Sequence, residues 1–84
     1  MKLEIYSVYD GKASYFMQPV FMQSRGHAVR NLMDSANDKT HFLGKNPEDY
    51  TLFYLGSFDD SDGKFDLLVT PEPVGKAIQF VKPV

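Results

Sequence analysis

The segment SRGHAVRNLMDSAN, residues 24–37, decides the fold class because its apolar residues follow a helical period. They recur at spacings that place them in one stripe along a helix: Ala28, Val29, Leu32, Met33 and Ala36. Ser24 is the predicted N-cap, because its hydroxyl can accept a hydrogen bond from the free amides of the first turn. Asn37 and Asp38 are expected to close the helix. The sequence therefore predicts one helix over residues 25–37.

The segments before this helix change to the period of a β-strand. Residues 2–9 alternate between two faces and are rich in aromatic and β-branched side chains, which predicts a strand. Asp10-Gly11 follows, a strong signal for a two-residue hairpin because that turn needs positive φ. A second strand is expected over residues 12–18. Pro19 cannot donate a ladder hydrogen bond, so it ends that strand or marks a sheet edge.

The segments after the helix predict a loop and a second hairpin. Residues 38–49 contain two breakers, a glycine and a proline, and are expected to form a loop. Residues 51–58 hold the most apolar run of the chain, which indicates a strand buried on both faces or touching a partner on one. The Asp- and Gly-rich segment 59–63 predicts a turn, and residues 64–69 the fourth strand.

The C-terminal part is harder to assign from sequence. Pro71 and Pro73 are expected to break the chain after the fourth strand, and residues 75–81 fit either a short strand or a helical turn. The order β-β-α-β-β predicts an α+β fold, an antiparallel sheet with one helix packed on one face. With 84 residues the chain forms one domain, 1–84, and we expect its tail to be loosely attached from about residue 71.

Composition limits the classes of protein that the chain can belong to. It contains no cysteine, which excludes disulfides and thiolate metal sites and fits a reducing compartment. Seven Phe and five Tyr can fill the core of a free-standing fold, with a homodimer that hides a second apolar face as the open alternative. The net charge of −2 argues against DNA binding driven mainly by phosphate contacts. The N-terminal residues lack the apolar core of a signal peptide, so a cytosolic protein is expected.

The acidic turn resembles a calcium loop only superficially. Counting back from Gly63, an EF-hand loop would place Asp62 and Asp60 at two ligand positions. It would also place Phe58 at the first ligand position and Val69 at the twelfth, where an acidic residue is required. We therefore expect a solvated turn and no metal.

No residue pattern indicates catalysis. His27 and His41 are fourteen positions apart, without the further ligands of a metal site or a nucleophile held against the imidazole. The adjacent carboxylates at 48–49 lie in a predicted loop, where solvation is the default. The six glycines do not form a nucleotide-binding fingerprint. The sequence predicts a protein without enzymatic activity or cofactor.

Two binding surfaces can be suggested from the sequence. Basic side chains at the start of the helix lie near aromatic residues, a combination that binds single-stranded nucleic acid by stacking and phosphate contact; the candidate residues are Arg25, His27, Arg30 and Tyr15. In the alternative reading these aromatics fill the core and the arginines are solvated. Exposed apolar patches mark interfaces with a second copy or a partner, and the candidates for this role are Phe53, Tyr54, Leu55, Tyr6 and Val8.

Three segments of the chain resemble a known viral family. They are MKLEIYSVYD, FMQSRGHAVRNLMDSAND and NPEDYTLFYLGSFDDSDGK. They resemble the small nonstructural protein of gokushoviruses, tailless icosahedral bacteriophages with circular single-stranded DNA genomes. The resemblance runs from Met1 to about Gly63 and is looser after Pro71.

The resemblance implies a phage protein made in the bacterial cytoplasm and absent from the mature virion. The family is commonly labelled a DNA-binding or nonstructural protein. It is likened to a microvirus protein that switches replication from double-stranded synthesis to production and packaging of the single-stranded genome. Two functions stay open at this point. One is a DNA-associated regulator of replication and packaging, and the other is a homodimeric interaction module that docks on a phage replication or procapsid component or a host factor.

Overall fold

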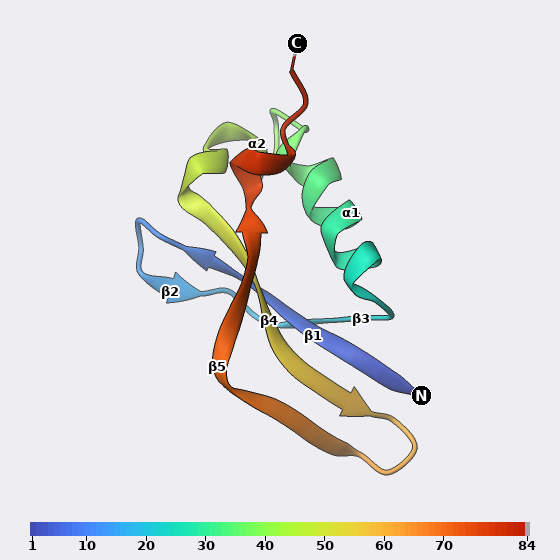
Figure 1. The fold of residues 1–84 in the computed structure, drawn as a ribbon. Coiled ribbons are helices and arrows are strands. Elements are labelled where there is room, and N and C mark those ends of the chain that lie inside the picture. The colour runs from blue at the N-terminus through green and yellow to red at the C-terminus, as the bar shows by residue number, and fades with distance from the viewer. Residues whose placement is uncertain (84) are drawn as a thin grey trace.

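A curled antiparallel sheet with one long helix on one face organises residues 1–83, which the computed structural model describes (Figure 1). The elements are β1 (Lys2–Asp10), β2 (Tyr15–Phe16), β3 (Val20–Met22), α1 (Arg25–Ala36), α2 (Phe42–Lys45), η1 (Pro47–Asp49), β4 (Tyr50–Asp59), β5 (Lys64–Lys76) and η2 (Ala77–Phe80). The strand order is β2-β1-β4-β5, and β3 also pairs with β1. The predicted α+β class is confirmed.

The long strands β1, β4 and β5 form the frame of the sheet. β1 and β4 pair from Lys2–Asp59 to Asp10–Tyr50, with a register shift after Ile5. β4 and β5 also pair irregularly, because the ladder passes from Tyr54–Glu72 to Gly56–Leu67. Four residues of β5, 68–71, therefore have only one residue of β4, Leu55, opposite them. A bulge of this kind bends the strand and increases its twist, and the far half of the β4–β5 hairpin extends away from the helices (Figure 1).

Local signals in the sequence position α1. Ser24 caps the helix as predicted, and its hydroxyl accepts a hydrogen bond of 3.2 Å from the amide of His27. The helix ends at Ala36, and Asn37 forms the C-cap. The side chain of Asn37 donates to the carbonyl of Phe80 at 2.9 Å and accepts from the amide of Lys82 at 2.7 Å. One side chain therefore ends the helix and fixes the C-terminal segment beside it.

The core lies between α1 and the sheet. Its buried members are Tyr6, Ala28, Leu32, Ala36, Leu43, Leu52 and Ala77. The ring of Tyr6 is fully buried, and its hydroxyl donates a hydrogen bond of 2.6 Å to the carboxylate of Glu4. Burial raises the pKa of Tyr6, and the hydrogen bond to Glu4 raises it further. The phenol is thus held in its neutral form inside the core.

The first hairpin differs from its prediction. Asp10 pairs with Tyr15, so the connection has four residues, 11–14, and the positive φ of 61° falls at Ser14 rather than at Gly11. The second strand is also shorter than expected, since β2 spans only Tyr15–Phe16, and a separate strand, β3, follows Pro19. Proline removes a ladder donor, and the chain resumes pairing with β1 only after it. The three-residue strand β3 was not predicted.

The later segments also depart from the prediction. The expected loop over 38–49 contains α2 and η1, and α2 is capped by the His41 ring, whose Nδ1 accepts from the Leu43 amide at 3.1 Å. The expected break at Pro71 and Pro73 is wrong, because β5 runs through both to Lys76. Proline is tolerated there because β5 is an edge strand.

The C-terminal segment is docked on the core. The helical alternative for residues 75–81 is the one observed, since η2 spans Ala77–Phe80. Ala77 is fully buried and Phe80 packs against the core cluster. This docking contrasts with the expectation of a loosely attached tail from about residue 71.

Candidate binding surface

The two faces of the sheet carry different aromatic groups. Residues directly opposite one another on neighbouring strands lie on the same face, and successive residues alternate between faces. On the face covered by α1, Tyr6 stands opposite Tyr54, with ring centroids 5.3 Å apart. The Arg25 guanidinium carbon lies 5.3 Å from the centre of the Tyr54 ring, and Arg25 Nη2 is 3.1 Å from the Glu72 carboxylate. Arg25 therefore links α1 to the sheet.

The opposite face carries a first group of three rings, Phe21, Phe58 and Phe65, called here the distal triad. They come from β3, β4 and β5, and their centroids are 4.8 to 6.4 Å apart. Phe58 lies directly opposite Phe65 in the register of the second hairpin. Phe21 is 47% exposed and Phe65 58% exposed. Such offset and edge-on contacts hold the rings as a group while leaving their outer surfaces open.

A second group of three rings, Tyr9, Phe16 and Phe53, forms the proximal triad. Its centroids are 4.8 to 6.1 Å apart, and its members come from β1, β2 and β4. The alternation of β1 places Tyr9 on the same face as Ile5, the partner of Phe21. Tyr9 lies four positions after Ile5, which is about 13 Å along a strand. The two triads thus lie on the same sheet face, opposite α1, and together they are called here the aromatic strip.

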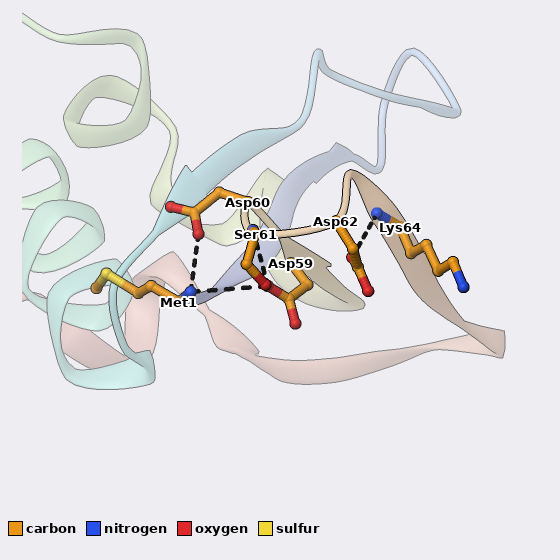
Figure 2. A network of polar contacts seen from close by, with 6 residues as sticks. All are labelled: Met1, Asp59, Asp60, Ser61, Asp62 and Lys64. Carbon is orange, nitrogen blue, oxygen red and sulfur yellow. Dashed lines mark hydrogen bonds and ion pairs between the residues drawn. The ribbon is translucent and has the colours of Figure 1, made fainter.

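The acidic turn between β4 and β5, residues 59–63, is held by hydrogen bonds among its own residues and with Met1 and Lys64 (Figure 2). Asp59 accepts from the hydroxyl and the amide of Ser61, and Asp62 accepts from the amide of Lys64 at 3.0 Å. The α-amino group of Met1 donates to Asp60 at 2.8 Å and lies 3.6 Å from Asp59. These contacts give each of the three carboxylates a hydrogen-bond donor within the protein.

The turn should make hairpin stability depend on pH at both ends of the range. The Ser61 hydroxyl and amide hold the pKa of Asp59 below its ordinary 3.8, so this stabilisation is present above 3.8 and is lost as pH falls through the folded-state pKa. The hydrogen bond to Asp60 raises the pKa of the Met1 amine above 8.0, so that contribution is lost as pH rises through the raised value. Amide hydrogen exchange in the turn, measured against pH, should show both losses. Ser61→Ala loses the hydroxyl but keeps the amide, so it should reduce the acidic loss and leave the alkaline one, and an unchanged acidic limb would contradict the assignment.

The residues suggested for nucleic-acid binding do not come together. His27 and Arg30 are exposed on α1, whereas Arg25 is engaged with Tyr54 and Glu72. Tyr15 pairs with Asp10 at the far end of β1, while β3, which leads into α1, ends opposite Glu4. These two positions on β1 are six residues, or about 20 Å, apart.

The residues suggested for an interface are divided between the two faces. Phe53 is half-buried in the proximal triad, and Leu55 is half-buried at the bulge. Tyr54 and Val8 pack against the core under α1. Tyr6 is wholly buried there, so its assignment to a surface is corrected. The distal triad was not identified from the sequence, although alternation on both sides of the acidic turn could have paired Phe58 with Phe65.

A pocket of about 200 Å³ lies between α1 and the β1–β3 side of the sheet. Its walls are mostly apolar and include Met22, Leu32 and Leu52, with Asn31 and His41 among the few polar contributors. Among residues 1–83, no three His, Asp or Glu side chains gather closely enough to share a metal ion. No helix in this part of the chain is long and apolar enough to cross a membrane.

The comparisons with known proteins identify the family. A family model described as "Phage ORF5 protein" matches residues 3–80. The chain belongs to this phage ORF5 family. The match runs from β1 through η2 and so includes both aromatic triads. No curated protein and no solved structure matches the chain. The bacteriophage origin expected from the resemblance is confirmed.

Proposed function

We propose that this phage ORF5 protein is a nonstructural, non-enzymatic protein of gokushovirus type that binds single-stranded viral DNA. It acts in the host cytoplasm during genome replication and packaging and is absent from the mature virion. The observation that carries the proposal is the aromatic strip on the sheet face opposite α1. Family membership supports a phage role, and the strip supplies a surface with the chemistry to bind bases.

Exposed rings on a sheet are suited to sequence-tolerant binding of single strands. Each base that stacks on an aromatic side chain contributes about 1–3 kcal/mol, and every base has a face that can stack. Phe21 and Phe65 offer the most open rings of the distal triad, and Phe16 is the exposed ring of the proximal triad. A single strand lying along β1 could reach both triads, whereas the paired bases of a duplex are not free to stack.

The electrostatics of the strip predict an unusual dependence on salt. Neither triad contains a charged side chain, and the adjoining turn is acidic. Each phosphate neutralised on a single strand contributes about −0.7 to the slope of log K against log salt concentration. We therefore expect a shallow slope, equivalent to about one or two phosphate contacts. A steep slope would favour the basic residues of α1 over the aromatic strip.

The decisive experiment is an anisotropy titration of a labelled single-stranded oligonucleotide across a range of salt concentrations. Phe65→Ala should weaken binding about tenfold or more, because one stacking platform is lost. Val69→Ala is the matched control, since Val69 is fully exposed on the same strand and belongs to neither triad. Equal loss in both variants, or duplex DNA bound as tightly as single strands, would overturn the proposal.

Arg30→Ala tests the basic alternative more cleanly than Arg25→Ala. Arg30 is exposed on α1, so its loss should leave the fold intact. Arg25 contacts Glu72 and Tyr54, so its replacement would disturb the packing of α1 on the sheet as well as any phosphate contact.

A protein-docking module is the second candidate function. It is favoured by a run of exposed apolar side chains in β5, namely Phe65, Leu67, Leu68 and Val69. Exposed apolar surface of this kind marks interaction sites. A replication component, a procapsid component or a host factor would be the partner. The absence of DNA binding, together with binding of a purified phage component that is lost in Phe65→Ala, would favour this function.

A further inference from the structure

We infer that two copies of this chain associate by pairing residues 64–66 of their β5 strands antiparallel, around a two-fold axis at Phe65, with Gly63 and Leu67 flanking the pair. The inference concerns the protein alone and does not depend on DNA binding. It rests on three features of the described residues. They are a free strand edge, a self-complementary charge pattern, and a bend in β5 that limits the contact to this segment.

The outer edge of β5 is open over its first half. β5 is the last strand in the sheet order, and each residue from Lys64 to Thr70 is exposed. Phe65 and Leu67 are 58% and 60% exposed. One half of the β4–β5 hairpin lies beside the helices, whereas the half next to the acidic turn, which contains the first half of β5, extends beyond them (Figure 1). A free strand edge carries unpaired backbone donors and acceptors that can pair with another strand.

The charges on either side of Phe65 identify a second copy as the occupant. A two-fold axis at Phe65 places Lys64 of each copy opposite Asp66 of the other, so the contact contains two opposite-charge pairs. Moving the axis one residue to Asp66 would place the two Asp66 side chains directly opposite each other, which is unfavourable. Lys64 and Asp66 lie on the helix-covered side of the sheet, because they pair with Asp59 and Ser57.

The shape of β5 confines the contact to this short segment. The strand pairs regularly with β4 from Lys64 to Leu67 and then bends through the unpaired residues 68–71. Pro71 and Pro73 follow, and neither has a backbone N–H to donate to a ladder. A second copy can therefore add a regular ladder only over residues 64–66, between Gly63 of the turn and the bend that follows Leu67.

The same axis brings apolar side chains together on the opposite face. A two-fold axis perpendicular to the sheet keeps corresponding faces on the same side, so the Phe65 rings of the two copies become neighbours. Leu67 of each copy then lies opposite Gly63 of the other, where no side chain obstructs it. The two distal triads would form one apolar surface, which removes part of each exposed ring from water.

The test is the mass of the purified full chain in solution, measured by sedimentation equilibrium without DNA. At about 100 µM chain, a micromolar dissociation constant would give mainly dimer, with twice the 9.6 kDa of one chain. Lys64→Asp and Asp66→Lys should each raise the dimer dissociation constant about tenfold or more, because both charge pairs become repulsive. The double variant Lys64→Asp/Asp66→Lys exchanges the charges and should restore the dimer.

The design separates loss of association from loss of folding. Lys64 and Asp66 are exposed, so all three variants should keep the circular dichroism spectrum of the parent protein. Lys39→Asp, an exposed reversal after α1, controls for the change in net charge and should leave the dimer intact. A monomeric parent protein, single reversals that stay dimeric, or a folded double variant that stays monomeric would each overturn the inference. The charge variants leave both aromatic triads unchanged, so these outcomes are independent of whether the protein binds DNA.

Discussion

Gly56→Ala is expected to lower the free energy of unfolding by about 3 kcal/mol or more, the largest effect of any single change considered. Gly56 has φ +143°, a conformation that residues with a Cβ rarely adopt. A Cβ there would lie 2.3 Å from the Asp66 carbonyl oxygen and 2.8 Å from the Leu67 Cα. Since Gly56 pairs with both Ile5 and Leu67, the strain falls where β1, β4 and β5 meet.

The matched control is Gly63→Ala in the acidic turn. Gly63 also has positive φ, +72°, but a Cβ there would have nothing within 4 Å. The left-handed conformation alone costs a non-glycine residue about 1–2 kcal/mol. Urea unfolding followed by circular dichroism should therefore show a clearly smaller loss for Gly63→Ala. Equal losses would mean that the close contact with β5 contributes nothing.

Leu52→Ala should destabilise the protein by about 3 kcal/mol, the second large effect. Leu52 is 4% exposed and belongs to the core cluster between α1 and the sheet. Truncation removes buried surface and leaves a cavity beside an existing pocket that Leu52 lines. For a domain of this size the melting temperature should fall by roughly 15 °C.

Leu67→Ala provides the comparison for Leu52→Ala, because the same side chain is removed from an exposed position. Leu67 is on β5 and is 60% exposed, so we expect a change in unfolding free energy within about 0.5 kcal/mol. Both variants should be melted at low protein concentration, so that any self-association does not contribute. Similar losses at both positions would contradict the assignment of Leu52 to the core.

The parts of the fold that were predicted correctly are those set by local chemistry. The cap at Ser24, the apolar stripe of α1 and the turn at 59–63 depend on residues close together in sequence. The failures have tertiary causes. Pro71 and Pro73 predicted a break because the sequence does not show that β5 lies at an edge, where proline is tolerated. Tyr6 was assigned to a surface because alternation shows that a strand has two faces but not which one the helix covers.

The aromatic strip was less accessible to prediction than the fold. Phe21 joins Phe58 and Phe65 only through the pairing of β3 with β1, and β3 is too short to be recognised from its sequence. The Phe58–Phe65 pair follows from the turn between them and could have been found. Basic residues near aromatics in the sequence suggested a site at the start of α1, but six positions along β1 separate the partner of Tyr15 from the partner of Met22, the last residue of the strand that leads into α1.

The uneven edges of the sheet have a consequence for the behaviour of the protein at high concentration. One edge is made of β2 and β3, two and three residues long and divided around Pro19, while the other is regular only before the β5 bend. Growth of a fibre requires a strand that can be extended on both sides, copy after copy. This sheet can pair with another copy at one edge only, so edge-to-edge pairing ends in a closed dimer. We therefore expect the protein to stay free of fibres even at high concentration.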